Sequence, residues 1–334
     1  MRSVFLCEQF MKVTINERDY ILLTKCPLLE TTERYEFKTD IHQSFDASSE
    51  ERIPLLDAAR QSFNYSMLAY KAEIQGMFDT FYDELRAEYL IPQMLETVTV
   101  SDIDGDFIDC DTSLLNVGVD SFILVKSNNT FAAVQVTEIG RYEVIEEVPT
   151  YFDGFRIHTA IEATSPILQP LRLCIIDGDM TAQMNALVFK PQVTFRVLEN
   201  IEYPISAAPE QFNSEDYYDW KVLLNGDYLD VSFSQHQNIV DGGMGNIWGY
   251  THWMGAKKMF VLRLLMRNPQ EYIDLKKWFY RRRGRLNAFY LQMFEGDKNN
   301  PVKRLFRLNS DAIEFNFKGA GIVETNVPVV ELTP

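Results

Sequence analysis

The densest group of side chains that could do chemistry is a run of aspartates between positions 102 and 111. They are Asp102, Asp104, Asp106, Asp109 and Asp111. Oxygen ligands at alternate positions suit Ca²⁺, but a calcium loop counted from Asp102 needs Gly and Glu where this chain has Phe107 and Ser113. The run therefore favours a turn at Asp104-Gly105 between two acidic strand ends, and we predict no metal site.

Catalytic and cofactor patterns are absent from the sequence. The histidines are scattered, and neither HExxH nor GxSxG occurs. Gly242-Gly243-Met244-Gly245 has neither spacing of a phosphate-binding loop, and no cysteine has a neighbouring histidine. Acidic pairs such as Glu146-Glu147 could act as general acid and base, but any acidic protein contains such pairs. We therefore predict that the chain is not an enzyme and holds no cofactor.

A basic cluster, Arg281-Arg282-Arg283-Gly284-Arg285, has two interpretations. With the aromatic neighbours Phe279, Tyr280 and Phe289 it could contact single-stranded nucleic acid. At the end of a helix, arginines also interact favourably with the helix dipole, and Gly284 is the expected left-handed cap. We favour the structural interpretation, with ion pairs to the acidic surface of another subunit as a second use.

The charge of the whole chain argues against a surface that holds nucleic acid. There are 48 acidic and 32 basic side chains, a formal net charge of −16, whereas phosphate binding needs clustered Lys and Arg. Acidic walls would instead repel a DNA duplex and let it slide past. No apolar run reaches the roughly 20 residues that span a bilayer, and residues 1–10 are too broken by polar residues for a secretory signal. We expect a soluble, unprocessed chain without membrane insertion.

The length of 334 residues predicts two or three domains. Four cysteines are too sparse for a disulfide scaffold, so we expect reduced thiols in the core. They are Cys7, Cys26, Cys110 and Cys174.

The element before the basic cluster must position it, and the sequence predicts that this element is a helix over 269–283. Asn268 is a suitable N-cap and Pro269 suits the first helical position. One face carries apolar residues at helical spacing, and an aromatic strand follows. The structural motif of this region consists of Trp278, Phe279, Arg283, Gly284, Phe289 and Tyr290.

A similar unit occurs about 200 residues earlier, which indicates an internal duplication. Here the helix is predicted over 71–86 and leads into an extended segment in which Leu90 corresponds to Tyr290. The matching residues of the first half are Phe78, Phe81, Leu85 and Leu90. Between the halves, five short β runs from Glu96 to Val148 are separated by turn residues, which is typical of a small all-β barrel or sandwich.

The predicted fold class is mainly β (α+β), with two sandwich or barrel domains that carry one helix each and a small all-β insert. We divide the chain into a first domain (1–98), the insert (99–159), a linker and strands that complete the first domain (160–205), and a second domain (206–334). Three prolines between Pro149 and Pro170 predict a linker or crossover, and four glycines between Asp241 and Gly249 predict a flexible loop.

This order of features resembles bacteriophage minor tail proteins of the distal-tail and tail-hub type. In the first half the motifs are FNYSML, EIQGMFDTFYDELRAEYLIPQM and the all-β module that follows. In the second half they are Trp220-Lys221-Val222, NIVDGGMG and WFYRRRGRLNAFYLQMFEGD. The sequence departs from the family pattern at Tyr290, where tryptophan is usual, and at Gln292, where proline is usual.

The resemblance implies a structural role in the virion, after assembly in the host cytoplasm. The chain would form a trimeric or hexameric ring at the tail tip that connects the tail tube protein to baseplate, hub or receptor-binding fibre proteins. DNA would pass transiently through its lumen. Three duplicated chains would present six similar domains. Two other classes stay open: a carbohydrate-binding module, favoured by 13% aromatic residues, and a tail-associated hydrolase, for which no nucleophile is visible.

Overall fold

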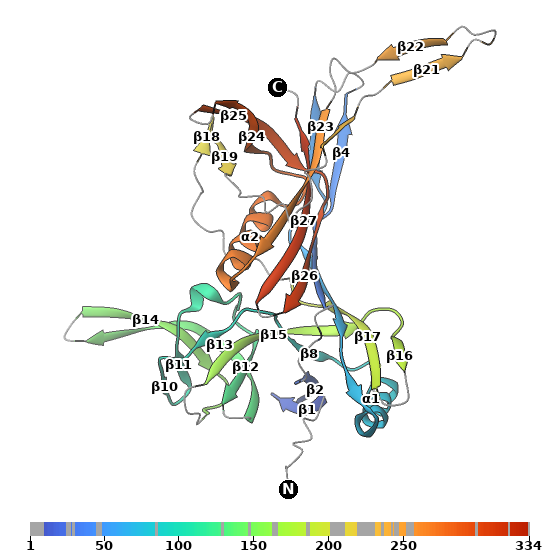
Figure 1. The fold of residues 1–334 in the computed structure, drawn as a ribbon. Coiled ribbons are helices and arrows are strands. Elements are labelled where there is room, and N and C mark those ends of the chain that lie inside the picture. Colours follow the sequence, from blue (N-terminus) through green and yellow to red (C-terminus); the bar gives the residue numbers. More distant parts are fainter. Residues whose placement is uncertain are drawn as a thin grey trace.

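The computed structural model describes most of the chain and shows a mainly β fold, as predicted (Figure 1). The described residues are 10–24, 28, 31–44, 49–83, 86–127, 130–145, 148–161, 166–184, 188–200, 211–218, 231–234, 237–241, 243, 247–251, 257–297, 300–319 and 321–332. They include two α-helices, α1 (Lys71–Asp83) and α2 (Pro269–Arg282). No helix in these ranges is long and apolar enough to cross a bilayer.

The first unit is built from strands on both sides of an insertion. Its strands are β1 (Phe10–Ile15), β2 (Arg18–Leu23), β3 (Thr32–Glu36), β4 (Thr39–Gln43), β5 (Glu50–Pro54), β6 (Arg60–Ser66), β7 (Ala69–Tyr70), β8 (Tyr89–Pro92), β15 (Ile167–Ile176), β16 (Thr181–Met184) and β17 (Val188–Val197). β2 runs parallel to β8, and the sheet continues antiparallel through β15, β17, β6 and β3. β16 forms a hairpin with β17. The alternating burial along β17 gives this sheet one face on the core.

The insertion between β8 and β15 has its own core. It contains β9 (Val98–Thr99), β10 (Asp102–Asp104), β11 (Phe107–Asp109), the 3₁₀ turn η1 (Thr112–Leu114), β12 (Phe122–Ser127), β13 (Thr130–Ile145) and β14 (Val148–Ile157). β13 pairs with β12 on one part of its length and with β14 on another, so the strands curve around Ile108, Val134 and Phe155. The expected linker between Pro149 and Pro170 is therefore wrong for most of its length, because β14 and the start of β15 occupy it.

The second unit follows as one continuous stretch. Its strands are β18 (Gln211–Phe212), β19 (Glu215–Tyr218), β20 (Val231–Ser234), β21 (Gln237–Asp241), β22 (Ile247–Thr251), β23 (Lys257–Met266), β24 (Phe289–Asp297), β25 (Asn300–Leu308), β26 (Ala312–Gly319) and β27 (Ile322–Glu331). β19 runs parallel to β24, and the sheet continues antiparallel through β25, β27, β23 and β20. β26 forms a hairpin with β27. Asp241 and Ile247 to Gly249, expected in a loop, belong to the projecting hairpin β21–β22.

The two units have the same order of strand pairing. In each, a hairpin is followed by a strand, a second hairpin, a strand, a helix and a strand that lies parallel to the first hairpin. The first hairpins even share their turn geometry, since Asn16-Glu17 and Asn213-Ser214 all have left-handed backbones with φ of 50°, 66°, 50° and 68°. β6 of the first unit and β23 of the second, the long strands that lead toward each helix, place a buried phenylalanine, Phe63 or Phe260, opposite the last strand of their unit.

Candidate functional site

The junction between the two units is the most elaborately built site in the described part of the chain. β3 of the first unit pairs antiparallel with β26 of the second, so one sheet runs through both units. Tyr35, Phe37 and Ala59 of the first unit lie in the same core cluster as the buried face of α2. The second unit therefore completes its core with side chains from the first.

A buried charge cluster lies at this junction. The Lys276 Nζ donates to Glu96 Oε1 at 2.6 Å and to Glu33 Oε1 at 3.4 Å, and all three side chains are fully buried. Tyr272, one helical turn before Lys276, donates its hydroxyl to Glu33, and Gln93 Nε2 donates to Glu96 at 2.8 Å. Two carboxylates and an amine could serve acid–base chemistry at an open site. Sealed from solvent, these groups instead tie β3 to α2.

All four arginines of the basic cluster are engaged within the chain, and Arg283 donates to the Asp57 carbonyl at 3.2 Å. Arg281 and Arg282 both form ion pairs with Asp216, which is 3% exposed. Burial by itself raises the pKa of this carboxyl, but the hydrogen bond from Arg281 and the charges of both arginines outweigh burial and hold its pKa below the usual value. These arginines are thus part of the second unit's framework.

The turn after α2 explains why glycine follows three arginines. Arg283 ends the helix in the left-handed conformation, and Gly284 is left-handed as well, with φ of 62°. A Cβ on Gly284 would lie 2.7 Å from Asp311 Oδ1, so the position excludes a side chain on steric as well as conformational grounds. Arg285 donates to Asp311 Oδ2 and to the carbonyl of Thr39, both at 2.9 Å. The turn therefore fixes the first unit's β4 to the second unit.

The motif residues of the second half lie around this junction. Trp278, Phe279 and Phe289 are buried, and the rings of Trp278 and Phe289 meet edge to face at 5.3 Å. Tyr290 is partly exposed and packs on Phe212 at 4.9 Å.

In the first half, Phe81 and Leu90 are buried. Phe78 belongs to α1, but its side chain lies outside the described residues, as do Leu85, Trp220-Lys221-Val222 and Gly242.

Sequence reasoning did not single out Lys276, Glu33 or Glu96. One signal was available, because Lys276 lies on the apolar stripe of its helix, four residues after Tyr272 and three before Phe279. A lysine on such a face needs a buried partner or a route to solvent. Its partners, however, lie 180 and 243 positions away.

The aspartate run forms turns and ion pairs. Asp104 pairs with Arg141 at 3.0 Å, and Asp111 caps η1 by accepting from the Ser113 backbone. The described residues contain no group of three His, Cys, Asp or Glu side chains arranged to hold a metal. Cys110 is buried, and its burial, together with the smaller effect of nearby aspartates, raises the pKa of its thiol to about 12.

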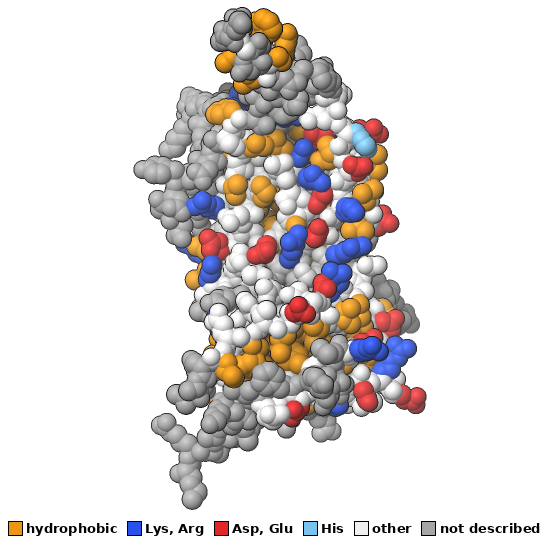
Figure 2. Space-filling view, turned by 90° about the vertical axis from the view of Figure 1, so that its right-hand side faces the viewer, with side chains coloured by type: hydrophobic (Ala, Val, Ile, Leu, Met, Phe, Trp, Pro, Cys, Tyr) orange, Lys and Arg blue, Asp and Glu red, His pale blue; other side chains and the backbone are white. Residues whose placement is uncertain are grey.

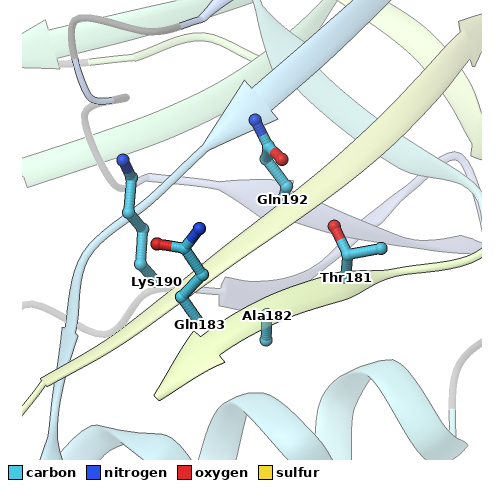
Figure 3. Close-up of a pocket in the computed structure, with 5 residues that line it drawn as sticks. All are labelled: Thr181, Ala182, Gln183, Lys190 and Gln192. Carbon is cyan, nitrogen blue, oxygen red and sulfur yellow. The ribbon is translucent and has the colours of Figure 1, made fainter. Parts of the chain in front are cut away.

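Small depressions on the described surface include two in the first unit. One, of about 130 Å³, is lined by residues of the first unit that include Arg60, Asp177 and Arg196. The other, of about 180 Å³, lies along the β16–β17 ribbon (Figure 3). Thr181, Ala182, Gln183, Lys190 and Gln192 line it.

Comparisons with known proteins add no family. No protein-family model matches the chain, and no curated protein matches it.

Proposed function

We propose that the chain is a structural protein of a bacteriophage virion that forms a ring at the distal end of the tail. The ring connects the tail tube to baseplate, hub or fibre proteins and leaves a channel for DNA. The observation that carries the proposal is the repeated unit: two units with one strand order, joined edge to edge in a single sheet. Similar units joined by a repeated contact are how closed rings are built.

The distribution of polar groups supports a structural role over a catalytic one. The buried ionic groups of the junction, Lys276 with Glu33 and Glu96, hold elements together and are sealed from solvent. The net charge of −16 suits a channel that DNA must pass without sticking. Three chains would give six units, which fits a sixfold tube above the ring.

The projecting hairpin β21–β22 supports contact with other chains. Ile239, Ile247, Trp248 and Tyr250 are each more than half exposed in the isolated chain. Hydrophobic side chains are visible on this hairpin at the top of Figure 2. Several exposed apolar side chains on one arm mark an interaction surface.

Two measurements test the proposal. Mass photometry of the purified chain should give one dominant species at a small integral multiple of 38.8 kDa. Immunogold labelling of intact phage particles that carry the gene should place the chain at the tail tip. A monomer at every concentration, together with particles that lack the label, would rule the proposal out.

A further inference from the structure

Several strands in the described ranges pair on one side only, and β16 and β20 are two of them. In the described ranges, β16 pairs only with β17 and β20 only with β23. Both carry an exposed large apolar side chain: Met184 on β16 is 69% exposed and Phe233 on β20 is 65% exposed. Open strand edges with apolar side chains favour pairing with another chain.

The junction inside the chain shows what such edges do when they are covered. β3 and β20 take equivalent places, because β3 pairs with β6 and β20 with the equivalent strand β23, Glu33 opposite Phe63 and Val231 opposite Phe260. β26 and β16 are equivalent in the same way, since each forms the hairpin with its unit's last strand. The pair β3–β26 is thus a template for the pair β20–β16.

The apolar residues at the open edges occupy positions that are buried at the junction. By strand pairing Phe233 takes the position of Tyr35, which is 1% exposed, and Met184 takes that of Phe317, which is 4% exposed. Figure 2, which faces the side of the molecule where Figure 1 draws β16, shows hydrophobic side chains gathered on the lower part. In Figure 3, Ala182 points from β16 toward α1, on the side opposite to Thr181 and Gln183.

We propose that β20 of one chain pairs antiparallel with β16 of the next, so that the contact β3–β26 is repeated between copies of this chain. The inference rests on the proposed ring and names its interface. Unlike strands meet, so the contact is head to tail and propagates around a ring instead of stopping at a twofold dimer.

The template also fixes the register. In the junction Arg34 lies opposite Glu314 and Glu33 opposite Phe315. By the strand pairings, Ser232 corresponds to Arg34 and Thr181 to Glu314, so in the proposed contact Ser232 lies opposite Thr181 of the neighbouring chain. Val231 lies opposite Ala182 in the same way. A slip by one residue would turn every side chain to the wrong face.

The hairpins that follow β3 and β20 extend the same correspondence. The β4–β5 hairpin grips the second unit through a paired contact of Glu50 with Arg307, at 2.6 and 3.0 Å, and through Thr39 with Asp311. Between chains, β21–β22 would lie over the first unit of the neighbour. By strand pairing Ile175 holds the position of Arg307 there. An apolar hairpin thus meets an apolar residue where the polar hairpin met an arginine.

A disulfide trap tests the pairing and its register. We would introduce Thr181→Cys and Ser232→Cys into a chain with Cys7→Ser and Cys26→Ser, leaving Cys110 and Cys174, which are buried. Directly opposite residues of antiparallel strands lie close enough for a disulfide. Mild oxidation should link most chains into dimers and trimers on a denaturing gel. The matched control, Arg34→Cys with Glu314→Cys, should close within one chain and produce no ladder.

Single variants decide whether the contact is head to tail, between unlike strands, or twofold, between like strands. Thr181→Cys alone and Ser232→Cys alone should stay monomeric on the gel, while a mixture of the two should form linked dimers. Linked dimers from either single variant by itself would overturn the head-to-tail contact. The slipped pair Thr181→Cys with Phe233→Cys should link at least tenfold more slowly, because neighbouring residues of a strand face opposite ways.

A charge at the open edge gives a second readout. Met184→Lys should weaken self-association by about tenfold or more in mass photometry, because a lysine at a buried edge disfavours pairing. Val119→Lys, at an exposed residue of the insert, should leave self-association unchanged. If closed oligomers form without any Thr181–Ser232 link, while the Arg34–Glu314 control closes, this interface is overturned and the proposed ring still stands. A chain that never associates would remove both.

Discussion

The second unit covers its β26 edge with β3 and buries Phe317, whereas in the described part of the first unit the outer edge of β16 is unpaired and Met184 is exposed at the same position. Their helices differ in the same sense. α2 has an asparagine cap, a buried lysine and arginines at its end, while α1, over its described residues Lys71–Asp83, has no basic residue in its last turn. One strand order thus occurs twice, once with a junction held by buried charge and once with an edge that the described residues leave uncovered.

Among the variants that test this contrast, Lys276→Met should cause the largest loss of stability. Glu33 and Glu96 would remain fully buried without their cation, which costs about 3–5 kcal/mol of unfolding free energy for a broken buried pair. Urea denaturation followed by tryptophan fluorescence measures the loss. Lys277→Met is the matched control: its Nζ donates to the Ser113 carbonyl near the surface, so the change should cost less than about 1 kcal/mol. Equal effects of the two variants would show that the buried charge does not hold the junction.

Asp216→Asn should weaken the second unit in a pH-dependent way. Burial opposes ionisation of this carboxyl, but Arg281 and Arg282 lower its pKa below the usual value, so its ionised form stabilises the folded state. That contribution is complete above the unfolded pKa of about 3.9 and is lost as pH falls toward the lower folded pKa.

We expect Asp216→Asn to lose about 1.5–3 kcal/mol at pH 7, the range for hydrogen bonds to charged groups. The gap between variant and native chain should close as pH falls below about 4, which urea midpoints across pH will show. A gap that stays constant down to pH 3 would contradict the role of the Asp216 charge. Burial raises the pKa of Asp311, but its hydrogen bonds with Arg285 and Thr39 outweigh burial, so the pKa is below its usual value. Asp311 should therefore add to the acid sensitivity in the same direction.

Local signals in the sequence were enough to place the helices. Asn268 and Pro269 mark the start of α2, and the observed Pro269–Arg282 ends one residue before the predicted 269–283 because Arg283 already has a left-handed backbone. For α1 the predicted 71–86 compares with the described Lys71–Asp83. Capping and turn chemistry involve neighbours in sequence, so they can be read without the fold.

Long-range features could not be read in the same way. Pro149 lies opposite Val144 in β13–β14, and Pro170 lies opposite Ile123 between β12 and β15, although the prolines suggested a linker. The β3–β26 pair joins residues about 280 apart by number, and no local pattern specifies such a pairing. The candidate junction was therefore visible from the sequence only in its helix and turn.

Asn268→Ala tests the cap that distinguishes α2. The Asn268 side chain accepts from the Glu271 backbone at 2.9 Å, and Glu271 in turn accepts from the Arg267 backbone at 2.8 Å. Removing the capping oxygen should cost about 1 kcal/mol. Thermal unfolding measured by circular dichroism will detect it, with Gln270→Ala, which keeps the cap, as the control. No shift in melting temperature would mean that the junction, and not the cap, determines where α2 begins.

The smallest effect is expected from the opposite change in the first unit, Tyr70→Asn. Tyr70 precedes α1, is 59% exposed, and its backbone N–H already donates to Glu73 at 2.9 Å, as the second half of a capping pair would. An asparagine there would supply the missing acceptor for the first turn and should add up to about 1 kcal/mol. Tyr70→Ala is the control, because it removes the same ring without adding an oxygen. If Tyr70→Asn is no more stable than Tyr70→Ala, then the start of α1 differs from that of α2 in more than its capping residue. The two units would then correspond in their strands but not in the way their helices begin.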